Sequence, residues 1–344
     1  MRRRFSILAA LFLGFATACP GQSPSADGKD GTLVLAYFRQ RYEGRVEIDA
    51  QGKEHQVPLP DPMNVEYLHL ATSSDGRHWT PLNGNKPVWN QRLRDPFVRR
   101  GPDGMWHLMG TGGRREERAS GPVCLHAVSK DLLKWETVEA LPLMKGVKDE
   151  EGRPARNIWA PEWFADPKSG DTFVIWSSSF EDTGWKKSKL WYSRTKDWKT
   201  FTPAKVLFDP PYSVIDGSLL EQGGKYYLFH KEEEFSPATG ERRAIRVAVA
   251  DTIEGSYKIH EGPLNKGQIV PVITEGPSIS RDPKGSGWLL FYDYCMTNRF
   301  GLSSSPDLLN WKLEEDVAFP ADARHGSVFE LNAEELRKLR QAFP

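Results

Sequence analysis

The sequence predicts an all-β fold, a five-bladed β-propeller with about four antiparallel strands per blade and a short C-terminal helix. A strand-like run followed by Asp and, a few residues later, by an aromatic residue occurs five times along the chain. The copies stand 54 to 66 residues apart, and their aspartates are Asp75, Asp131, Asp197, Asp251 and Asp307. Repeats of that length made of short strands are typical of propellers. Five copies therefore predict five blades, in which these phrases form outer-hairpin turns and packing anchors.

Short runs rich in β-forming residues, most of them preceded by turn signals, are the second observation that favours this fold. The runs are residues 33–38, 105–109, 172–176, 225–229 and 287–292. Residues 45–59 predict an extra hairpin that turns at 51–52, and residues 112–121 and 144–157 predict long loops. Loops of this kind often wall a ligand pocket in a propeller.

A helix is expected only at the C-terminal end. Asn332 and Glu335 have the spacing of a capping box, and Leu336, Leu339 and Phe343 share one face. This tail is predicted to pack against the propeller.

The composition excludes one broad class of partner. The chain has 46 basic and 46 acidic residues, so no overall field favours nucleic acid. Its 12 Trp residues serve blade packing and, in part, stacking on sugar rings. Cys124 and Cys295 lie in apolar strand-like runs and are expected to be buried free thiols. A monomer is expected.

The N-terminal segment reads as a targeting signal. Residues 1–18 combine three arginines with an apolar run too short to span a bilayer, which is typical of a signal peptide. Cys19 then suits lipidation, and residues 19–31 suit a flexible tether, although simple secretion fits the same residues. Residues 32–344 are expected to form a single catalytic domain. The expected location is the periplasm, the outer membrane or the cell surface of a bacterium, with membrane attachment only through lipidated Cys19.

A second repeated element carries the chemistry. Short phrases containing Asp, Glu, Gly or Pro recur at the same interval, at residues 94–97, 159–162, 215–218, 274–277 and 324–327. Each is expected at the start of the innermost strand of a blade, so its side chains converge near the axis. Asp95, Asp216 and Glu275 are the three acids that this arrangement brings together.

Three converging carboxyl groups suit inverting glycoside hydrolysis. That reaction needs one carboxylic acid to protonate the leaving oxygen and one carboxylate to activate water. A third carboxylate near the acid helps to keep it protonated. Glu has the longer reach, so Glu275 is the better candidate for the proton donor.

Together these phrases resemble glycoside hydrolase family 43, a family of five-bladed propellers that act on arabinosyl, xylosyl and galactofuranosyl linkages. The likeness covers roughly residues 31–330 and rests on Arg-Asp-Pro at 94–96, Trp-Ala-Pro-Glu at 159–162, Ile-Asp-Gly-Ser at 215–218, Glu-Gly-Pro at 275–277 and His-Gly-Ser at 325–327. It implies that Asp95 is the general base, Asp216 the pKa modulator and Glu275 the general acid. The phrases at 95–97 and 216–218 depart from the Asp-Pro-Ser of many relatives, which indicates an altered sugar pocket.

The resemblance also implies substrate contacts. The candidates are Arg94, Asn157, Trp159, Glu162, Lys231, Arg299 and His325. No cofactor is expected to be required, but a structural calcium near the axis could lie beside His325, bound through water. Residues 156–162 resemble members linked to furanosides, which favours exo release of terminal α-L-arabinofuranose or β-D-galactofuranose from a plant or microbial polysaccharide.

Two other interpretations stay open. In a retaining reaction of the family-32 type, Asp61 would be the nucleophile, Asp95 would stabilise the transition state and Glu162 would be the acid. The sequence lacks the Asn-Asp-Pro-Asn context of that family. Alternatively, the chain could be a non-catalytic glycan-binding surface lipoprotein, although binding alone does not need three converging acids.

Overall fold

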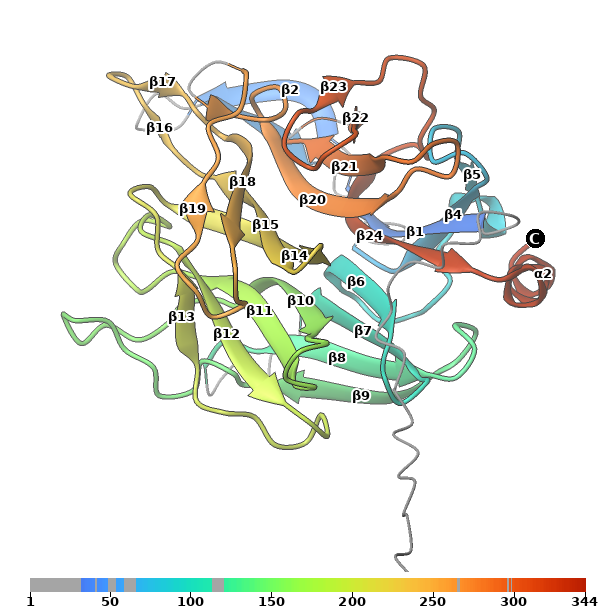
Figure 1. The fold of residues 1–344 in the computed structure, drawn as a ribbon, viewed down its shortest axis with the longest axis horizontal. Coiled ribbons are helices and arrows are strands. Elements are labelled where there is room, and N and C mark those ends of the chain that lie inside the picture. The colour runs from blue at the N-terminus through green and yellow to red at the C-terminus, as the bar shows by residue number, and fades with distance from the viewer. Residues whose placement is uncertain are drawn as a thin grey trace, which may run out of the picture.

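The computed structural model describes residues 32–40, 42–48, 54–58, 66–112, 121–264, 267–295, 297 and 299–344. Five four-stranded antiparallel sheets surround one axis, which confirms the five-bladed propeller (Figure 1). The predicted signal peptide, tether and Cys19 lie outside the described residues, as do Asp61 and most of the loop 112–121.

Each sheet forms one blade, whose strands follow one another from the innermost to the outermost. Blade 1 contains β24 (Ala323–Leu331), β1 (Thr32–Arg39), β4 (His69–Ser73) and β5 (Thr80–Pro81). Blade 2 contains β6 (Arg94–Arg100), β7 (Trp106–Thr111), β8 (Cys124–Ser129) and β9 (Trp135–Leu141). Blade 3 contains β10 (Trp159–Ala165), β11 (Thr172–Ser178), β12 (Lys189–Thr195) and β13 (Lys205–Phe208). Blade 4 contains β14 (Val214–Gln222), β15 (Lys225–Glu232), β18 (Ala244–Ala250) and β19 (Lys258–Ile259). Blade 5 contains β20 (Thr274–Arg281), β21 (Trp288–Tyr294), β22 (Phe300–Ser305) and β23 (Lys312–Leu313).

The ring is closed by the C-terminal strand. β24 pairs with β1 inside blade 1, so the two ends of the domain share one sheet. The five innermost strands contact one another in cyclic order, from β24 through β6, β10, β14 and β20 back to β24. Their first residues therefore face one another at one end of the axis (Figure 1).

The core lies between blades. Five apolar clusters are present in the described part of the chain, and each joins two neighbouring blades. In the second strand of a blade, successive side chains point to opposite faces of the sheet, so they pack against different neighbouring blades. On β15, Leu228 packs toward blade 3 and Phe229 packs toward blade 5. By the same alternation, successive polar residues at the end of β15 point toward different neighbouring blades.

The repeated Asp-to-aromatic phrases are turns after the third strand of each blade, as predicted. In the first copy, Asp75 Oδ1 accepts hydrogen bonds from the backbone N–H groups of Arg77 and His78. Ser73 Oγ accepts from the N–H groups of Asp75 and Gly76, and Trp79 is buried. The copies at 129–135, 195–201 and 305–311 repeat the Asp turn. The fourth copy has Ala250 where the others have Ser or Thr.

The remaining elements decorate the propeller. They are β2 (Tyr42–Ile48), β3 (Glu54–Pro58), β16 (Phe235–Ser236), β17 (Gly240–Glu241), the 3₁₀ turn η1 (Asn83–Asn85) and helix α2 (Ala333–Ala342). β2 and β3 pair as the predicted hairpin. The capping box of Asn332 and Glu335 is present, and Leu336 and Leu339 bury against the cluster between blades 1 and 2.

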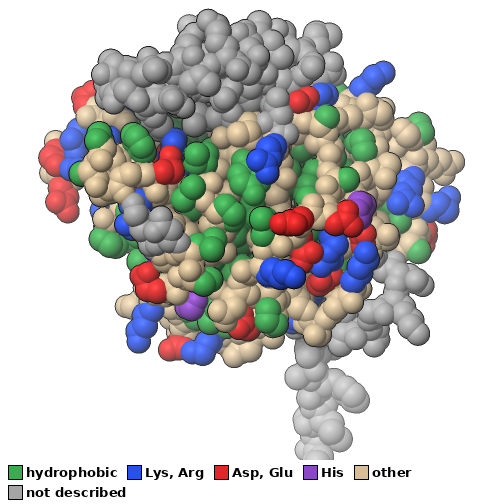
Figure 2. Space-filling view, turned by 90° about the horizontal axis from the view of Figure 1, so that it is seen from above, with side chains coloured by type: hydrophobic (Ala, Val, Ile, Leu, Met, Phe, Trp, Pro, Cys, Tyr) green, Lys and Arg blue, Asp and Glu red, His purple; other side chains and the backbone are tan. Residues whose placement is uncertain are grey.

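Cys124 and Cys295 are buried and free, as predicted. Within the described ranges, no helix has the length and apolarity needed to cross a membrane. Figure 2 shows acidic and basic side chains interspersed on the face that it presents, in keeping with the balanced composition.

Candidate active site

Every innermost strand starts with the same four-residue frame. The frames are residues 94–97, 159–162, 215–218, 275–278 and 324–327. In each, pairing with the second strand shifts register, which is the mark of a β-bulge. The bulge turns the side chain of its second residue toward the neighbouring blades instead of leaving it in the regular alternation.

The second position of the frame carries two of the predicted acids. Asp95 has φ 52° and Asp216 has φ 54°, and Ala160 and Gly276 adopt the same left-handed backbone in their own frames. Glu275 stands one position earlier, so the expectation that all three acids occupy equivalent positions was wrong. The difference has a steric cause. A Cβ at Gly276 would lie 2.6 Å from Cγ of His325.

Side chains on the second strands of four blades support the frames. Opposite the first position of four frames stand Thr111, Ser177, Lys231 and Asp293 on the second strands. Each reaches the next blade. Thr111 Oγ1 accepts from the N–H of Ala160 at 2.8 Å, and Ser177 Oγ accepts from the N–H of Asp216 at 3.0 Å. The bulges are therefore fixed by hydrogen bonds between blades.

His325 lies between the two aspartates. Its Nδ1 is 3.5 Å from Asp95 Oδ1 and 3.8 Å from Asp216 Oδ2. Burial opposes protonation of the ring, but the carboxylates of Asp216 and Asp95 outweigh burial, so the pKa of His325 lies above its usual value. The N–H of Gly276 donates to Asp216 Oδ2 at 3.1 Å, which connects this group to Glu275.

Glu275 is held by two cations. Lys231 Nζ donates to its Oε2 at 2.8 Å, and Arg324 donates to its Oε1. Burial would raise the pKa of Glu275, but Lys231 and Arg324 outweigh burial and hold that pKa well below its usual range. In this substrate-free arrangement Glu275 is a carboxylate.

Each of these cations also binds a second acid. Lys231 Nζ forms an ion pair with Glu233 Oε2 at 2.6 Å, and Arg324 Nε donates to Asp293 Oδ2 at 2.5 Å. Burial, together with the charge of Glu275, raises the pKa of Asp293 to about 6. Lys231 and Arg324 thus connect Glu275 to two further carboxyl groups.

Two carboxyl groups near the axis have raised pKa values. Burial, with a contribution from the charge of Glu275, raises the pKa of Asp216 to about 6. Burial raises the pKa of Glu162 to about 7, against a hydrogen bond to Ser218 and the attraction of Arg99. Glu162 occupies the fourth position of its frame, two residues beyond the bulge. Its side chain is therefore deeper along the axis than Asp95 and Asp216.

Comparisons with known proteins identify the family and agree with the fold. A family profile related to glycoside hydrolase family 43, described as a "Probable glycosyl hydrolase domain", matches residues 61–337. This chain belongs to the family-43-related glycosyl hydrolases. The range includes all five frames. No curated protein matches the sequence significantly.

Solved structures share the fold of this family-43-related hydrolase at low identity. A thermostable family-43 glycoside hydrolase has a TM-score of 0.54 and 13% identity, covering 83% of this chain and 96% of its own. A family-43 arabinoxylan arabinofuranohydrolase from Bacillus subtilis has a TM-score of 0.54 and 13% identity, covering 85% of this chain and 66% of its own. An inulosucrase from Halalkalicoccus jeotgali has a TM-score of 0.52 and 15% identity, covering 87% and 92%. Since an inulosucrase shares the fold, the fold alone does not fix the reaction.

In this hydrolase, two of the side chains predicted to contact substrate are already bound to other groups of the protein. Asn157 is buried, its Oδ1 accepts from the N–H and Oγ of Ser179, and its Nδ2 donates to Ser177 O. Its amide fixes the end of β11, and its predicted contact with sugar stays a prediction. The Lys231 side chain is only 3% exposed and contacts Glu275. Its predicted contact with sugar is therefore replaced by a contact with the acid.

Of the other predicted contacts, Glu162 and His325 are buried near the axis, whereas Trp159, Arg94 and Arg299 lie nearer to the surface. Trp159, the first residue of its frame, stacks on Trp185 with ring centroids 4.7 Å apart, and Arg156 covers the Trp185 ring at 3.3 Å. Trp185 is 42% exposed, and the sequence interpretation missed it. The sequence feature that could have indicated Trp185 is an aromatic residue within a Gly-containing turn, at residues 183–187.

Two arginines complete the predicted set. Arg94 lies over the Phe38 ring at 5.2 Å, and its buried Nε has no hydrogen-bond partner. Arg299 is exposed between β21 and β22 and lies over the Tyr294 ring at 4.6 Å. Both stand on the side of the molecule where the frames begin.

The predicted calcium beside His325 would be bound through water, and it stays a prediction. Ca²⁺ takes six to eight oxygen ligands. Across the described residues, no group of three or more His, Cys, Asp or Glu side chains is arranged to hold a metal ion. His325 is engaged with Asp95 and Asp216.

Proposed function

We propose that this glycoside hydrolase is an inverting exo-enzyme that releases a terminal furanosyl residue, α-L-arabinofuranose or β-D-galactofuranose, from a polysaccharide. The observation that carries the proposal is the pair Asp95 and Asp216 around His325, with Glu275 connected to Asp216 through the N–H of Gly276 at one end of the axis. Inversion needs one acid and one base, and a third carboxyl group adjusts the acid.

The roles follow from the neighbours of each acid. Asp95 is proposed as the general base, since a carboxylate next to His325 is well placed to take a proton from water. Asp216 is proposed as the modulator, because its charge opposes ionisation of Glu275. Glu275 is proposed as the acid that protonates the leaving oxygen.

Glu275 must gain a proton before it can donate one. Its carboxylate is ionised while Lys231 and Arg324 both hold it. Both cations have a second acidic partner, but Lys231 carries a single ammonium on a flexible stem and can shift onto Glu233 at 2.6 Å, whereas Arg324 binds its two acids through one planar guanidinium. We therefore propose that substrate entry shifts Lys231 toward Glu233 and lets the pKa of Glu275 rise.

A panel of aryl furanosides and pyranosides tests the function. Wild type is expected to cleave an arabinofuranoside or galactofuranoside, and NMR of the first product is expected to show the inverted anomer. Glu275→Ala should lose far more activity on poor leaving groups than on activated aryl glycosides, because activated groups need no proton. Equal loss on both would contradict the acid assignment.

One observation favours a second candidate. Glu162 has a pKa raised to about 7 by burial, so about half of it is protonated at neutral pH, as suits a proton donor. In the retaining reaction Glu162 would be the acid and Asp61, outside the described residues, the nucleophile. A product with retained anomeric configuration, together with greater loss in Glu162→Gln than in Glu275→Gln, would favour this candidate.

The location is a separate proposal. Export through residues 1–18 and lipidation at Cys19 would bring the enzyme to extracellular polysaccharide. Incorporation of labelled palmitate into the wild type but not into Cys19→Ser would support it, and equal absence in both would contradict it.

A further inference from the structure

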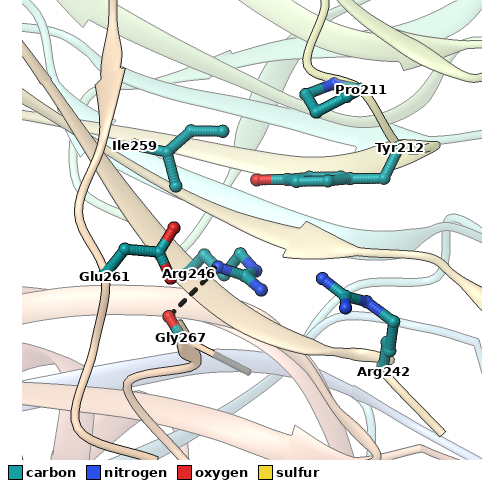
Figure 3. A pocket seen from close by; sticks show the side chains of 7 residues that line it. All are labelled: Pro211, Tyr212, Arg242, Arg246, Ile259, Glu261 and Gly267. Carbon is teal, nitrogen blue, oxygen red and sulfur yellow. Dashed lines mark hydrogen bonds and ion pairs between the residues drawn. The ribbon is translucent and has the colours of Figure 1, made fainter. Parts of the chain in front are cut away.

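A pocket of about 470 Å³ lies on blade 4, beside the segment that joins it to blade 3 (Figure 3). It is lined by Pro211, Tyr212, Arg242, Arg246, Ile259, Glu261 and Gly267. Tyr212 belongs to the segment that joins the two blades, and Arg246 lies on β18 of blade 4. No role in the proposed reaction uses these residues.

The pocket is on the same side of the propeller as the acids. Tyr212 precedes Asp216 by four residues, so their Cα atoms are at most about 14 Å apart even in a fully extended chain. Glu232, which binds the two arginines of the pocket, directly follows Lys231 on β15. Because side chains alternate along a strand, Lys231 faces Glu275 while Glu232 faces this pocket. The pocket is therefore close enough to the acids for one polysaccharide chain to reach both.

The inner wall of the pocket carries an excess of positive charge. Glu232 is fully buried, and its two carboxylate oxygens accept from Nε of Arg242 and Nε of Arg246. Two guanidinium groups and one carboxylate leave one net positive charge. Arg246 also donates from Nη1 to Gly267 O at 3.2 Å. These bonds fix both guanidinium groups in place.

The guanidinium of Arg242 retains hydrogen-bond donors for a ligand. Its side chain is 26% exposed, and among the described residues nothing is hydrogen-bonded to its two terminal nitrogens. Figure 3 shows its guanidinium turned toward Arg246 and the centre of the pocket. A fixed guanidinium with free terminal N–H groups matches a carboxylate, which it can bind through two parallel hydrogen bonds.

The opposite wall is apolar and rigid. The Tyr212 ring is held by a 2.9 Å hydrogen bond between its hydroxyl and His230 Nε2, and Arg246 lies over the ring at 5.5 Å. Pro211 and Ile259 flank the ring (Figure 3). A flat apolar wall beside a charged donor suits a sugar ring that carries an acid group.

We propose that this pocket is an accessory subsite for a uronic acid unit of the polysaccharide, with its carboxylate on Arg242 and its ring against Tyr212. The proposal rests on the proposed function for the idea that the ligand belongs to the substrate. The uronate subsite adds one property of the substrate, namely that the preferred polysaccharide is acidic.

Glu261 is the natural competitor of such a ligand. Its side chain is 77% exposed, and its Oε2 lies 3.9 Å from Arg246 Nη1, too far for a hydrogen bond. A bound uronate would meet this negative charge at the mouth of the pocket. Removing the charge should strengthen uronate binding, whereas removing Arg242 should weaken it.

Calorimetry with two trisaccharides tests the subsite. One is trigalacturonate, and the other is the same trisaccharide with its carboxyl groups reduced to alcohols. The measurements use Asp95→Asn as background, which prevents turnover. Trigalacturonate is expected to bind on the order of tenfold more tightly than the reduced form, as for charge-assisted hydrogen bonds. Arg242→Gln should abolish this preference, and Glu261→Gln should increase it about twofold.

The controls separate the subsite from general charge effects. Lys258→Gln removes an exposed cation of β19 that lies next to Ile259 but outside the lining, and it should leave the preference unchanged. Arg242→Lys keeps the charge and loses the planar fork, so most of the preference should be lost. Equal binding of the two trisaccharides, or a preference that survives in both Arg242 variants, would overturn the proposal.

The aryl glycoside panel and the trisaccharide calorimetry together distinguish failure of the uronate subsite from failure of the proposed function. If aryl furanosides are cleaved but the trisaccharides bind equally, the subsite is wrong and the enzyme assignment stands. If no furanoside is cleaved but trigalacturonate is preferred through Arg242, the uronate site stands and the furanosidase assignment is wrong.

Discussion

Replacement of Lys231 by Met tests how the proposed acid is controlled. Lys231 Nζ is 2.8 Å from Glu275 Oε2 and 2.6 Å from Glu233 Oε2, and the side chain is almost fully buried. Met keeps much of the volume and removes the charge. Because a positive neighbour favours the ionised form of a carboxyl group, its loss should raise the pKa of Glu275.

The size of the shift follows from the geometry. With charge centres about 4 Å apart and an effective dielectric constant of about 20, the pair interacts by about 4 kcal/mol. One pKa unit corresponds to about 1.36 kcal/mol, so about 3 units is an upper bound for the shift. Arg324 remains on the other oxygen of Glu275, so a rise of about 1–3 units is expected.

The pH dependence of kcat/KM is the assay. Its basic limb reports loss of the proton from the acid in the free enzyme, so the limb should move to higher pH by the same 1–3 units. Glu233→Gln removes a competitor for Lys231 and should move the limb the other way. Lys225→Met, the same substitution at the exposed start of β15, should not move it.

Removal of one member of a buried ion pair typically costs about 3–5 kcal/mol of stability, so the fold of Lys231→Met is checked by circular dichroism. A folded variant with an unmoved basic limb would refute either the acid role of Glu275 or its control by Lys231. The leaving-group dependence of Glu275→Ala then decides between these two.

Three further results are expected. Trp185→Ala should raise KM for an oligosaccharide about 2- to 10-fold with kcat unchanged, since an exposed stacking surface contributes about 0.5–1.5 kcal/mol; an unchanged KM would remove Trp185 from the binding surface. Gly276→Ala should nearly abolish activity while costing only about 1–3 kcal/mol of stability, because its φ is 64° and its Cβ would displace His325. In urea titrations, stability should decrease below pH 6.5, since burial lowers the pKa of His126 to about 3 and also lowers that of His107. The unfolded chain takes up these protons first, so the stability is complete above pH 6.5 and is lost as pH decreases toward the folded pKa values; His126→Gln should flatten the decrease.

The sequence predicted the blades because their signals are local. An Asp turn needs only a few adjacent residues, and Asp75 and Asp307 bond to their own neighbours. Two repeats in the same phase then located the inner strands. The least regular copy, around Asp251, still falls in the correct blade because the interval between copies is preserved.

The contacts between blades could not be predicted in the same way. Lys231 and Glu275 are 44 residues apart and meet only because β15 and β20 belong to adjacent blades. Lys231 was therefore interpreted as a sugar contact. The phrase around Asn157 also looked functional, but the position of β11 decides that its amide binds Ser179. Trp185 was missed because nothing in a turn sequence indicates which side of the molecule it faces.

The displaced position of Glu275 explains how one frame provides two kinds of acid. Gly276 occupies the bulge that Asp95 and Asp216 use, since a side chain there would meet the ring of His325. The carboxyl group of blade 5 must come from the preceding residue, and that position places it beside Lys231 and away from His325. Two acids consequently share an imidazole, while the third is held by cations of the neighbouring blades. Burial raises the pKa of Asp216, while Lys231 and Arg324 hold that of Glu275 low. Glu275 can therefore act as the acid only after one of these cations moves away from it.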